Sequence, residues 1–240
     1  MILPRERQVK TCDIEKVGVV SALLQTSPPE RDRPWRRRFY ASVADASFAC
    51  ASPQLFTGPD GFPYFALMTP EPYKAFDSFC LCNLTEKAIK DGFGAAINPS
   101  PAGVDWVFSY GDLLTYQMFG TFVVEDESPA EPFTAKETLQ QDESVLVGQP
   151  ADSYLPTSTR AHIRRYLEQR AGLQAPGVLL MVRPKDPRPR QLVFSVYRRD
   201  FPSEEAFRAV LQGISWYLPR HYMLIGLDEP KFGQAEFTPL

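Results

Sequence analysis

The sequence predicts a two-part α+β protein, in which a mixed α+β domain precedes a C-terminal βαββαβ domain of the ferredoxin-like, split βαβ kind. Short apolar runs bounded by glycine or proline alternate with stretches of helical apolar spacing. The hydrophobic content of 44% and the charged content of 23% are typical of globular proteins with a core. An acidic stretch separates the two parts.

The acidic stretch, residues 125–143, predicts a linker between domains 1–124 and 144–240. It holds one basic and seven acidic side chains, a net charge of −6, and it contains two prolines. Few apolar residues interrupt it, so it cannot contribute much to a core.

The C-terminal domain has the clearer pattern. Ser203 is a favourable helix cap, with Glu204 and Glu205 in the first turn, and Gly172 is a stop signal for the preceding helix. Strands are expected at residues 145–147, 178–182, 192–197 and 222–227, and helices at 157–170, capped by Thr157 or Ser158, and at 203–218.

The C-terminal strands do not alternate between apolar and polar residues. In residues 178–182 every side chain is apolar, and residues 192–197 are similar. Because a solvent-exposed sheet face is normally polar, we expect both faces to be covered. The tethered N-terminal domain, a second copy of the chain or a partner protein would supply the second cover.

The N-terminal domain has a weaker pattern, from which the strand order does not follow. Pro28 and Pro29 end the first helix, and Asn83 with Glu86 suggests the start of a helix that Gly92 ends. Helices are expected at residues 13–25, 83–92 and 111–118, and strands at 39–43, 47–51, 64–68, 95–97, 104–108 and 121–124. No internal repeat is visible in the sequence.

Composition and charge exclude several classes of protein. The net charge of −3 offers no overall attraction to nucleic acid or anionic lipid. No apolar run reaches the roughly 18 residues of a membrane-spanning helix, and the N-terminus lacks the apolar core of a signal peptide. We therefore expect a cytoplasmic protein with neither a membrane nor a nucleic acid as partner.

Four cysteines are too few in 240 residues for a disulfide scaffold. Cys12, Cys50, Cys80 and Cys82 lie in apolar or strand-like stretches, as small buried hydrophobic residues do. Structural zinc needs four ligands, and Cys80 and Cys82 have no second pair. The sequence therefore predicts buried cysteines and no metal site.

No catalytic or cofactor-binding residue is predicted. Gly92 and Gly94 suggest a nucleotide loop, but that fingerprint needs a strand before it and a helix after it, and here the expected order is reversed. His162 stands among arginines, which favours a solvated helix face, and His221 opens the last strand. The alternative function is that of an enzyme whose active-site residues are far apart in the sequence and form no recognisable motif.

RNA binding by the C-terminal sheet is a second alternative, because RNA-recognition domains share the βαββαβ order. Their third strand carries a basic residue, a glycine and spaced aromatic residues that stack on bases. Arg190, Phe194 and Tyr197 match this pattern, but residues 191–193 do not. The incomplete motif argues against a nucleic-acid partner.

A basic loop is the candidate interaction site. Arg183, Lys185, Arg188 and Arg190 alternate with prolines, which would hold the loop extended. One interpretation is a solvated hairpin loop without a binding function. The other is a surface that contacts an acidic partner. We expect a non-catalytic interaction or regulatory protein that binds another protein, with a homodimer as a further possibility.

Two segments resemble the family of the bacterial enhanced-serine-sensitivity protein, the SseB-like family. Residues 92–99, GFGAAINP, resemble a segment late in that family's N-terminal domain, and residues 144–151, SVLVGQPA, resemble the opening of its C-terminal domain. The resemblance spans most of residues 36–228. It implies a two-domain cytoplasmic protein of interaction or regulatory type, with no assigned catalytic residues.

Overall fold

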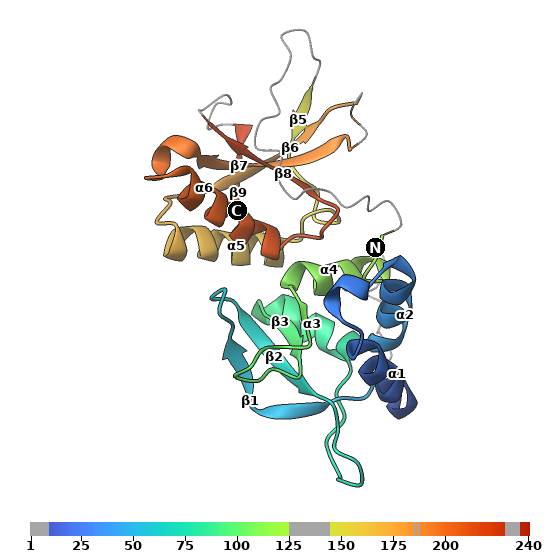
Figure 1. Ribbon diagram of the computed structural model, residues 1–240. Coiled ribbons are helices and arrows are strands. Elements are labelled where there is room, and N and C mark those ends of the chain that lie inside the picture. The colour runs from blue at the N-terminus through green and yellow to red at the C-terminus, as the bar shows by residue number, and fades with distance from the viewer. Residues whose placement is uncertain (1–9, 125–144, 185, 187, 229–235) are drawn as a thin grey trace. The chain divides into compact units, whose positions relative to one another are not determined.

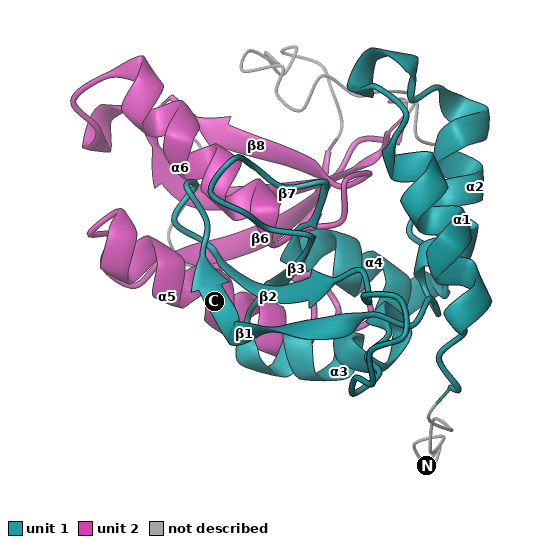
Figure 2. Cartoon of the chain, turned by 60° about the horizontal axis from the view of Figure 1, so that its bottom comes forward, with its two compact units in different colours: residues 1–123 teal, residues 124–240 magenta. Residues whose placement is uncertain are grey.

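The computed structural model describes residues 10–124, 145–184, 186, 188–228 and 236–240. Within them the protein is of the α+β class, with six α-helices and two mixed sheets (Figure 1). The chain divides into two compact units, Met1–Val123 and Val124–Leu240 (Figure 2). The predicted linker, 125–143, lies outside the described residues. No helix in the described part of the chain has the length and apolar character needed to cross a membrane.

The sheet of the first unit has the strand order β1-β2-β3-β4. β1 (Ala49–Thr57) pairs antiparallel with β2 (Pro63–Met68), and β2 pairs parallel with β3 (Gly94–Ile97). β4 (Trp106–Phe108) is antiparallel to β3, and α3 (Leu81–Asp91) connects the two parallel strands. All four residues of β3 are buried, which explains its continuous apolar sequence.

Three further helices complete the first unit. α1 (Ile14–Leu24) begins at Asp13, whose carboxylate accepts the Glu15 and Lys16 amides, and it confirms the expected first helix. α4 (Tyr110–Phe119) confirms the expected helix after β4 and begins with a capping box. α2 (Arg33–Val43) follows a short 3₁₀ turn, Pro28–Glu30.

The predicted strand at residues 39–43 is wrong, because these residues form the last turns of α2. Asp32 caps the helix by accepting the Trp35 amide at 2.8 Å. Trp35, Phe39 and Val43 recur every four residues and are all buried, so they form one apolar helix face. Phe39 stacks on Trp35, and its ring centroid lies 4.6 Å from that of Trp106 in β4.

Two other expectations in the first unit need correction. α3 begins at Leu81, two residues before the expected start, and Asn83 lies inside its first turn. Its end is as expected, because Gly92 adopts a left-handed φ of 82°. Residues 121–124 form no strand.

The sheet of the second unit has the strand order β5-β6-β7-β8. β5 (Leu146–Gly148) and β7 (Arg190–Tyr197) flank β6 (Gly177–Val182) in antiparallel pairs. β8 (Met223–Leu227) is parallel to β7. β9 (Thr238–Pro239) pairs with the start of β6, on the same edge as β5.

The order of elements in this unit is β-α-β-β-α-β, as the sequence predicts, but the ferredoxin-like split βαβ arrangement is wrong. In a split unit another strand separates the two parallel strands, whereas β7 and β8 are direct neighbours. β5 and β6 are also neighbours and run antiparallel. The order of elements follows from local sequence, but the positions of the strands depend on long-range pairing.

α5 (Thr157–Arg170) and α6 (Glu204–Trp216) lie on one face of this sheet (Figure 1). Ser203 caps α6 as predicted, by accepting the Ala206 amide. α5 has Pro156 at its cap position, so the predicted Thr157 or Ser158 cap is wrong. A 3₁₀ turn, Arg198–Asp200, follows β7.

Over β6, β7 and β8 the opposite face of this sheet is also apolar and buried, as expected, whereas Leu146 and Val147 of the edge strand β5 are 65% and 40% exposed. Cover by the N-terminal domain, a second copy or a partner stays a prediction. Leu179 and Val193 are fully buried there, in one cluster with Met181 and Leu227. Val145 and Phe237 of the same unit pack against this cluster. A Cβ at Gly177 would lie 2.8 Å from Phe237, which explains why this position has no side chain.

The two units repeat one topology that the sequence does not reveal. In each, a helix precedes an antiparallel hairpin, and a second helix leads to a third strand parallel to the second one. The matching series are α2-β1-β2-α3-β3 and α5-β6-β7-α6-β8.

Candidate functional site

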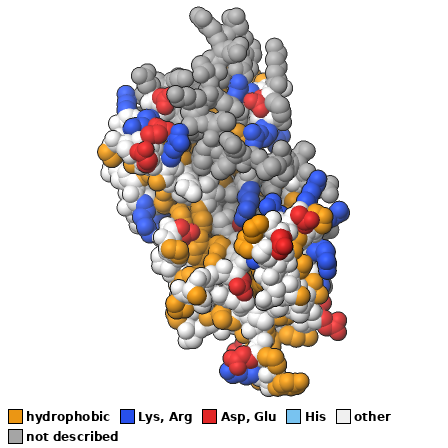
Figure 3. Space-filling model, viewed as in Figure 1, with side chains coloured by type: hydrophobic (Ala, Val, Ile, Leu, Met, Phe, Trp, Pro, Cys, Tyr) orange, Lys and Arg blue, Asp and Glu red, His pale blue; other side chains and the backbone are white. Residues whose placement is uncertain are grey.

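The exposed loop between β2 and α3 is the candidate functional site, and we call residues 69–80 the anchored loop. Residues 71–78 are all exposed, and the loop projects at the lower end of Figure 1. Hydrophobic and charged side chains gather at that end in Figure 3. Tyr73 is fully exposed, at 109% of the reference value, and Phe76 is 37% exposed. Exposed aromatic residues on a loop held by a rigid scaffold are typical of binding surfaces.

The tip of the anchored loop is a defined turn. Tyr73 has a left-handed backbone with φ of 62°, which is uncommon for residues other than glycine. Lys74 donates from its backbone to the Glu71 carbonyl, and its Nζ lies 3.1 Å from Glu71 Oε1. This ion pair is too exposed to stabilise the fold by much, but it lies beside Tyr73 and places both charges at the tip.

The first end of the anchored loop is fastened by Asn98. The Thr69 amide donates to Asn98 Oδ1 at 2.7 Å, and Asn98 Nδ2 donates to Thr69 Oγ1 at 3.0 Å and Asp105 Oδ2 at 2.7 Å. Asn98 directly follows β3 and has φ of 51°, a conformation that asparagine tolerates well. Asn98 of the 92–99 segment therefore acts as a structural clamp on the loop.

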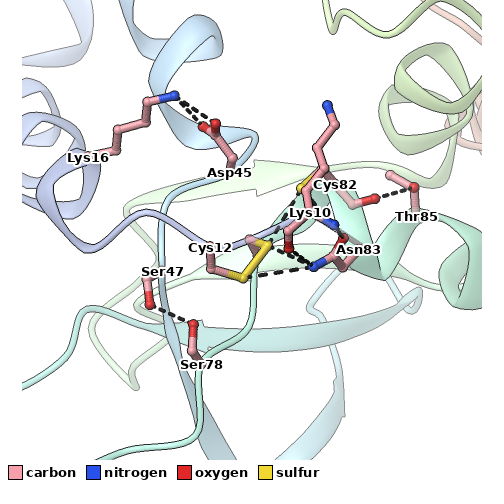
Figure 4. Close-up of a disulfide and its surroundings, with 10 residues drawn as sticks. Lys10, Cys12, Lys16, Asp45, Ser47, Ser78, Cys82, Asn83 and Thr85 are labelled. Carbon is pink, nitrogen blue, oxygen red and sulfur yellow. Dashed lines mark hydrogen bonds and ion pairs between the residues drawn. A yellow bond between two sulfur atoms is a disulfide. The ribbon is translucent and has the colours of Figure 1, made fainter. Parts of the chain in front are cut away.

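The second end of the anchored loop is fastened by three contacts. Phe48 and Phe79 exchange backbone hydrogen bonds of 2.8 Å, and the hydroxyls of Ser47 and Ser78 are 2.6 Å apart. A disulfide joins Cys80 to Cys12, a residue 68 positions earlier (Figure 4). The exposed tip is thus held at both ends by the body of the first unit.

The disulfide corrects the prediction that all four cysteines are simple buried hydrophobic residues. Cys12 and Cys80 are bonded, whereas Cys50 and Cys82 are free and partly exposed. Cys82 Sγ lies 3.5 Å from Cys80 Sγ. Despite these three neighbouring cysteines, the described residues contain no group of three or more side chains suited to hold a metal ion.

Charged groups near the cysteines have defined partners (Figure 4). The hydrogen bond to the Tyr116 hydroxyl raises the pKa of Lys10. Burial raises the pKa of the Cys82 thiol, and the nearby Lys10 charge opposes this shift. Lys16 pairs with Asp45 at 2.7 Å, and this hydrogen bond raises the pKa of Lys16.

The basic loop forms the expected hairpin turn between β6 and β7, but hydrogen bonds close the turn, so the prolines do not hold it extended. The Arg183 amide donates to the Pro189 carbonyl at 2.8 Å, and the Asp186 amide donates to the Arg183 carbonyl at 3.0 Å. Asp186 Oδ1 accepts the Arg188 amide at 2.7 Å. A turn closed by Asp186 explains why proline spacing alone did not keep the loop extended.

The three described residues of the predicted interaction site, Arg183, Arg188 and Arg190, lie in different surroundings. The Arg183 side chain is 13% exposed and lies 3.4 Å from Asp186. Arg190 lies over the ring of Tyr154, at 5.8 Å from its centroid. Arg188 is exposed, and Lys185 lies outside the described residues. A contact between these residues and an acidic partner therefore stays a prediction.

Side chains considered for other functions are largely buried. The expected solvated position of His162 is wrong, because it is 8% exposed and its ring stacks on Tyr217 of the second unit. Burial lowers the pKa of His221. Phe194 of β7 is fully buried, and Tyr197 packs against the apolar cluster of the second sheet face. A nucleic-acid base therefore cannot stack on Phe194 in this structure.

Sequence reasoning missed the anchored loop, although one signal was present. The segment 70–76, PEPYKAF, places two aromatic residues between charges and prolines just after a buried strand. Comparison with protein-family models, curated proteins and solved structures finds no match in any of the three.

Proposed function

We propose that this chain is a protein-binding module and that the anchored loop carries the contact with its partner. The supporting observation is a fully exposed Tyr73, in a left-handed turn, on a loop that Asn98 and the Cys12–Cys80 disulfide hold at both ends. Aromatic side chains such as this provide most of the binding free energy in many interfaces.

The chemistry of the loop suggests the kind of partner. Tyr73 and Phe76 together offer an apolar contact, which an apolar pocket on a folded protein would accept. Glu71, Lys74 and Asp77 surround them and give the loop a net charge of −1. A pocket with a basic rim therefore fits best. Because both ends are fastened, binding would cost little additional ordering of the loop.

The two alternative functions have weaker support. RNA binding by the C-terminal sheet would need Phe194 at the surface, where it is not found. An enzyme with a site formed only in space remains the runner-up, and no described cluster of side chains favours a particular reaction.

We also propose the finer expectations that the sequence raised. These are membership of the enhanced-serine-sensitivity family, a cytoplasmic location, and two domains joined by a linker at residues 125–143. The 92–99 and 144–151 segments support the first of these proposals.

Affinity capture with a photo-reactive amino acid at position 73 tests the binding proposal. We expect one cross-linked protein, whose affinity falls roughly 30-fold or more in a Tyr73→Ala, Phe76→Ala double variant. Leu55→Ala is the matched control, because Leu55 is 50% exposed in β1 of the same unit.

Equal affinity of the double variant and the control would rule out the anchored loop as the binding surface. Cross-linking to a second copy of the chain, with a sedimentation coefficient that falls in the double variant, would identify homodimerisation instead.

A further inference from the structure

The two sulfurs of the Cys12–Cys80 disulfide differ in their access to solvent. Cys80 is fully buried, at 0% exposure, whereas Cys12 is partly exposed in the segment before α1. Because solvent reaches the residue Cys12 and does not reach Cys80, we expect a thiol from solution to attack the Cys12 Sγ. This difference decides which sulfur an external nucleophile attacks and which sulfur leaves.

Two hydrogen-bond donors point at the buried sulfur (Figure 4). Asn83 Nδ2 lies 3.2 Å from Cys80 Sγ and farther, 3.9 Å, from Cys12 Sγ, and the Cys82 thiol lies 3.5 Å from Cys80 Sγ. Asn83 is itself held by Lys10, whose amide donates to Oδ1 at 3.0 Å and whose carbonyl accepts from Nδ2 at 2.8 Å. The donors are thus in place before any charge develops on Cys80.

Cys82 acts as a donor because it stays protonated. Burial is the largest influence on this thiol and raises its pKa, so at neutral pH it carries its proton. A thiol is a poor nucleophile but can donate a hydrogen bond to a neighbouring thiolate. Cys80 also lies at the N-terminus of the 11-residue α3, where negative charge is favoured.

We propose that Cys12–Cys80 is a thiol–disulfide exchange site for an external thiol, with Cys80 as the leaving group. The incoming thiol loses its proton to water, and its sulfur bonds to Cys12 Sγ. The Cys12–Cys80 bond breaks, and its electron pair goes to Cys80 Sγ, where Asn83 and Cys82 stabilise the thiolate. The product is a mixed disulfide on Cys12 and a free Cys80, with no change in the total number of disulfides. This chemistry does not depend on the proposed binding function.

The test uses the full chain with Cys50→Ser, so that Cys12, Cys80 and Cys82 are the remaining cysteines. The folded protein is treated with reduced glutathione or with a thioredoxin whose second active-site cysteine is replaced by serine, so that the mixed disulfide is not resolved, and it is then quenched in acid and mapped by mass spectrometry. We expect the adduct on Cys12 and a free thiol at Cys80. A faster reaction with glutathione identifies a small thiol as the physiological reagent, and a faster reaction with the thioredoxin identifies a protein dithiol.

Variants at position 82 separate the donor role from simple packing. Cys82→Ala removes the donor and should slow exchange about two- to tenfold, whereas Cys82→Ser keeps a hydroxyl donor and should restore the rate. Circular dichroism checks that both variants remain folded. An adduct on Cys82 or Cys80 in place of Cys12, or the same rate in both variants, would overturn the proposal.

Discussion

Asn98 and Thr69 are joined by two side-chain hydrogen bonds, one of 2.7 Å from the Thr69 amide and one of 3.0 Å to the Thr69 hydroxyl. They connect the end of β3 to the first residue of the anchored loop. An exposed loop therefore depends on a residue that lies nearly thirty positions later in the chain.

Two substitutions of Asn98 separate the stability that its side-chain hydrogen bonds provide from the strain of its left-handed backbone. Asn98→Ala loses the bonds and places alanine at φ of 51°, so we expect a loss of about 1–3 kcal/mol in the free energy of unfolding. Asn98→Gly loses the same bonds without the strain and should cost less. Urea denaturation measures both, and amide exchange at Thr69 should speed up. Equal stability of Asn98→Ala and the parent would contradict the clamp.

The disulfide should stabilise the first unit. Cys12 and Cys80 are 68 residues apart, and closing a loop of that size reduces the entropy of the unfolded chain by an amount equivalent to about 4 kcal/mol. Cys12→Ser should lose much of this, and a reducing agent should lower the parent to the same level. Cys50→Ser is the control, with little change expected. If the reducing agent leaves the urea midpoint of the parent protein unchanged, the disulfide contributes no stability.

Replacing two helical glycines by alanine should change the free energy of unfolding in opposite directions. Gly18 in α1 has nothing within 4 Å of the position of a Cβ, so Gly18→Ala should stabilise the helix by about 0.5–1 kcal/mol. At Gly213 in α6 the new Cβ would overlap the Tyr166 hydroxyl and ring, so Gly213→Ala should destabilise by about 1–3 kcal/mol. Adding Tyr166→Ala should reduce the second penalty. Thermal unfolding of all the variants checks the signs, and stabilisation by Gly213→Ala would refute the contact.

His221 should make stability depend on pH. Burial lowers its pKa below the ordinary value of 6.5, so the unfolded chain binds this proton more readily than the folded one. The stability that the neutral His221 contributes to the folded state is fully present above about pH 7.5. It is lost as the pH falls through 6.5 towards the lower pKa of the folded state. The slope from this group cannot exceed about 1.4 kcal/mol per pH unit. His221→Asn should remove that part of the slope between pH 7.5 and 5, measured by urea denaturation. An unchanged slope would mean that the group does not titrate differently on folding.

Local patterns determined most elements of this protein. α1, α6, β2, β6 and β7 follow from capping residues and apolar runs that lie entirely within each element, so the sequence predicted them within one or two residues. The unbroken apolar strands also predicted, correctly, that both faces of β6, β7 and β8 are covered, although the edge strand β5 is exposed. α2 was mistaken for a strand because its Phe39–Val43 end is apolar, although Trp35 and Asp32 upstream carry the helical signal.

Only the tertiary structure decided the features that depend on residues far apart. β7 and β8 precede and follow α6 in the sequence, and hydrogen bonds pair them as direct neighbours in the sheet. No local sequence pattern distinguishes this pairing from the split arrangement. Cys12 and Cys80 are separated in the sequence by α1, α2, β1 and β2, so the spacing of the cysteines did not reveal the bond. The loop that carries the exposed Tyr73 is held by Asn98 and Cys12, which come from different parts of the chain. The physical reason is common to all three: local sequence fixes backbone preference, whereas pairing and burial depend on the whole folded unit.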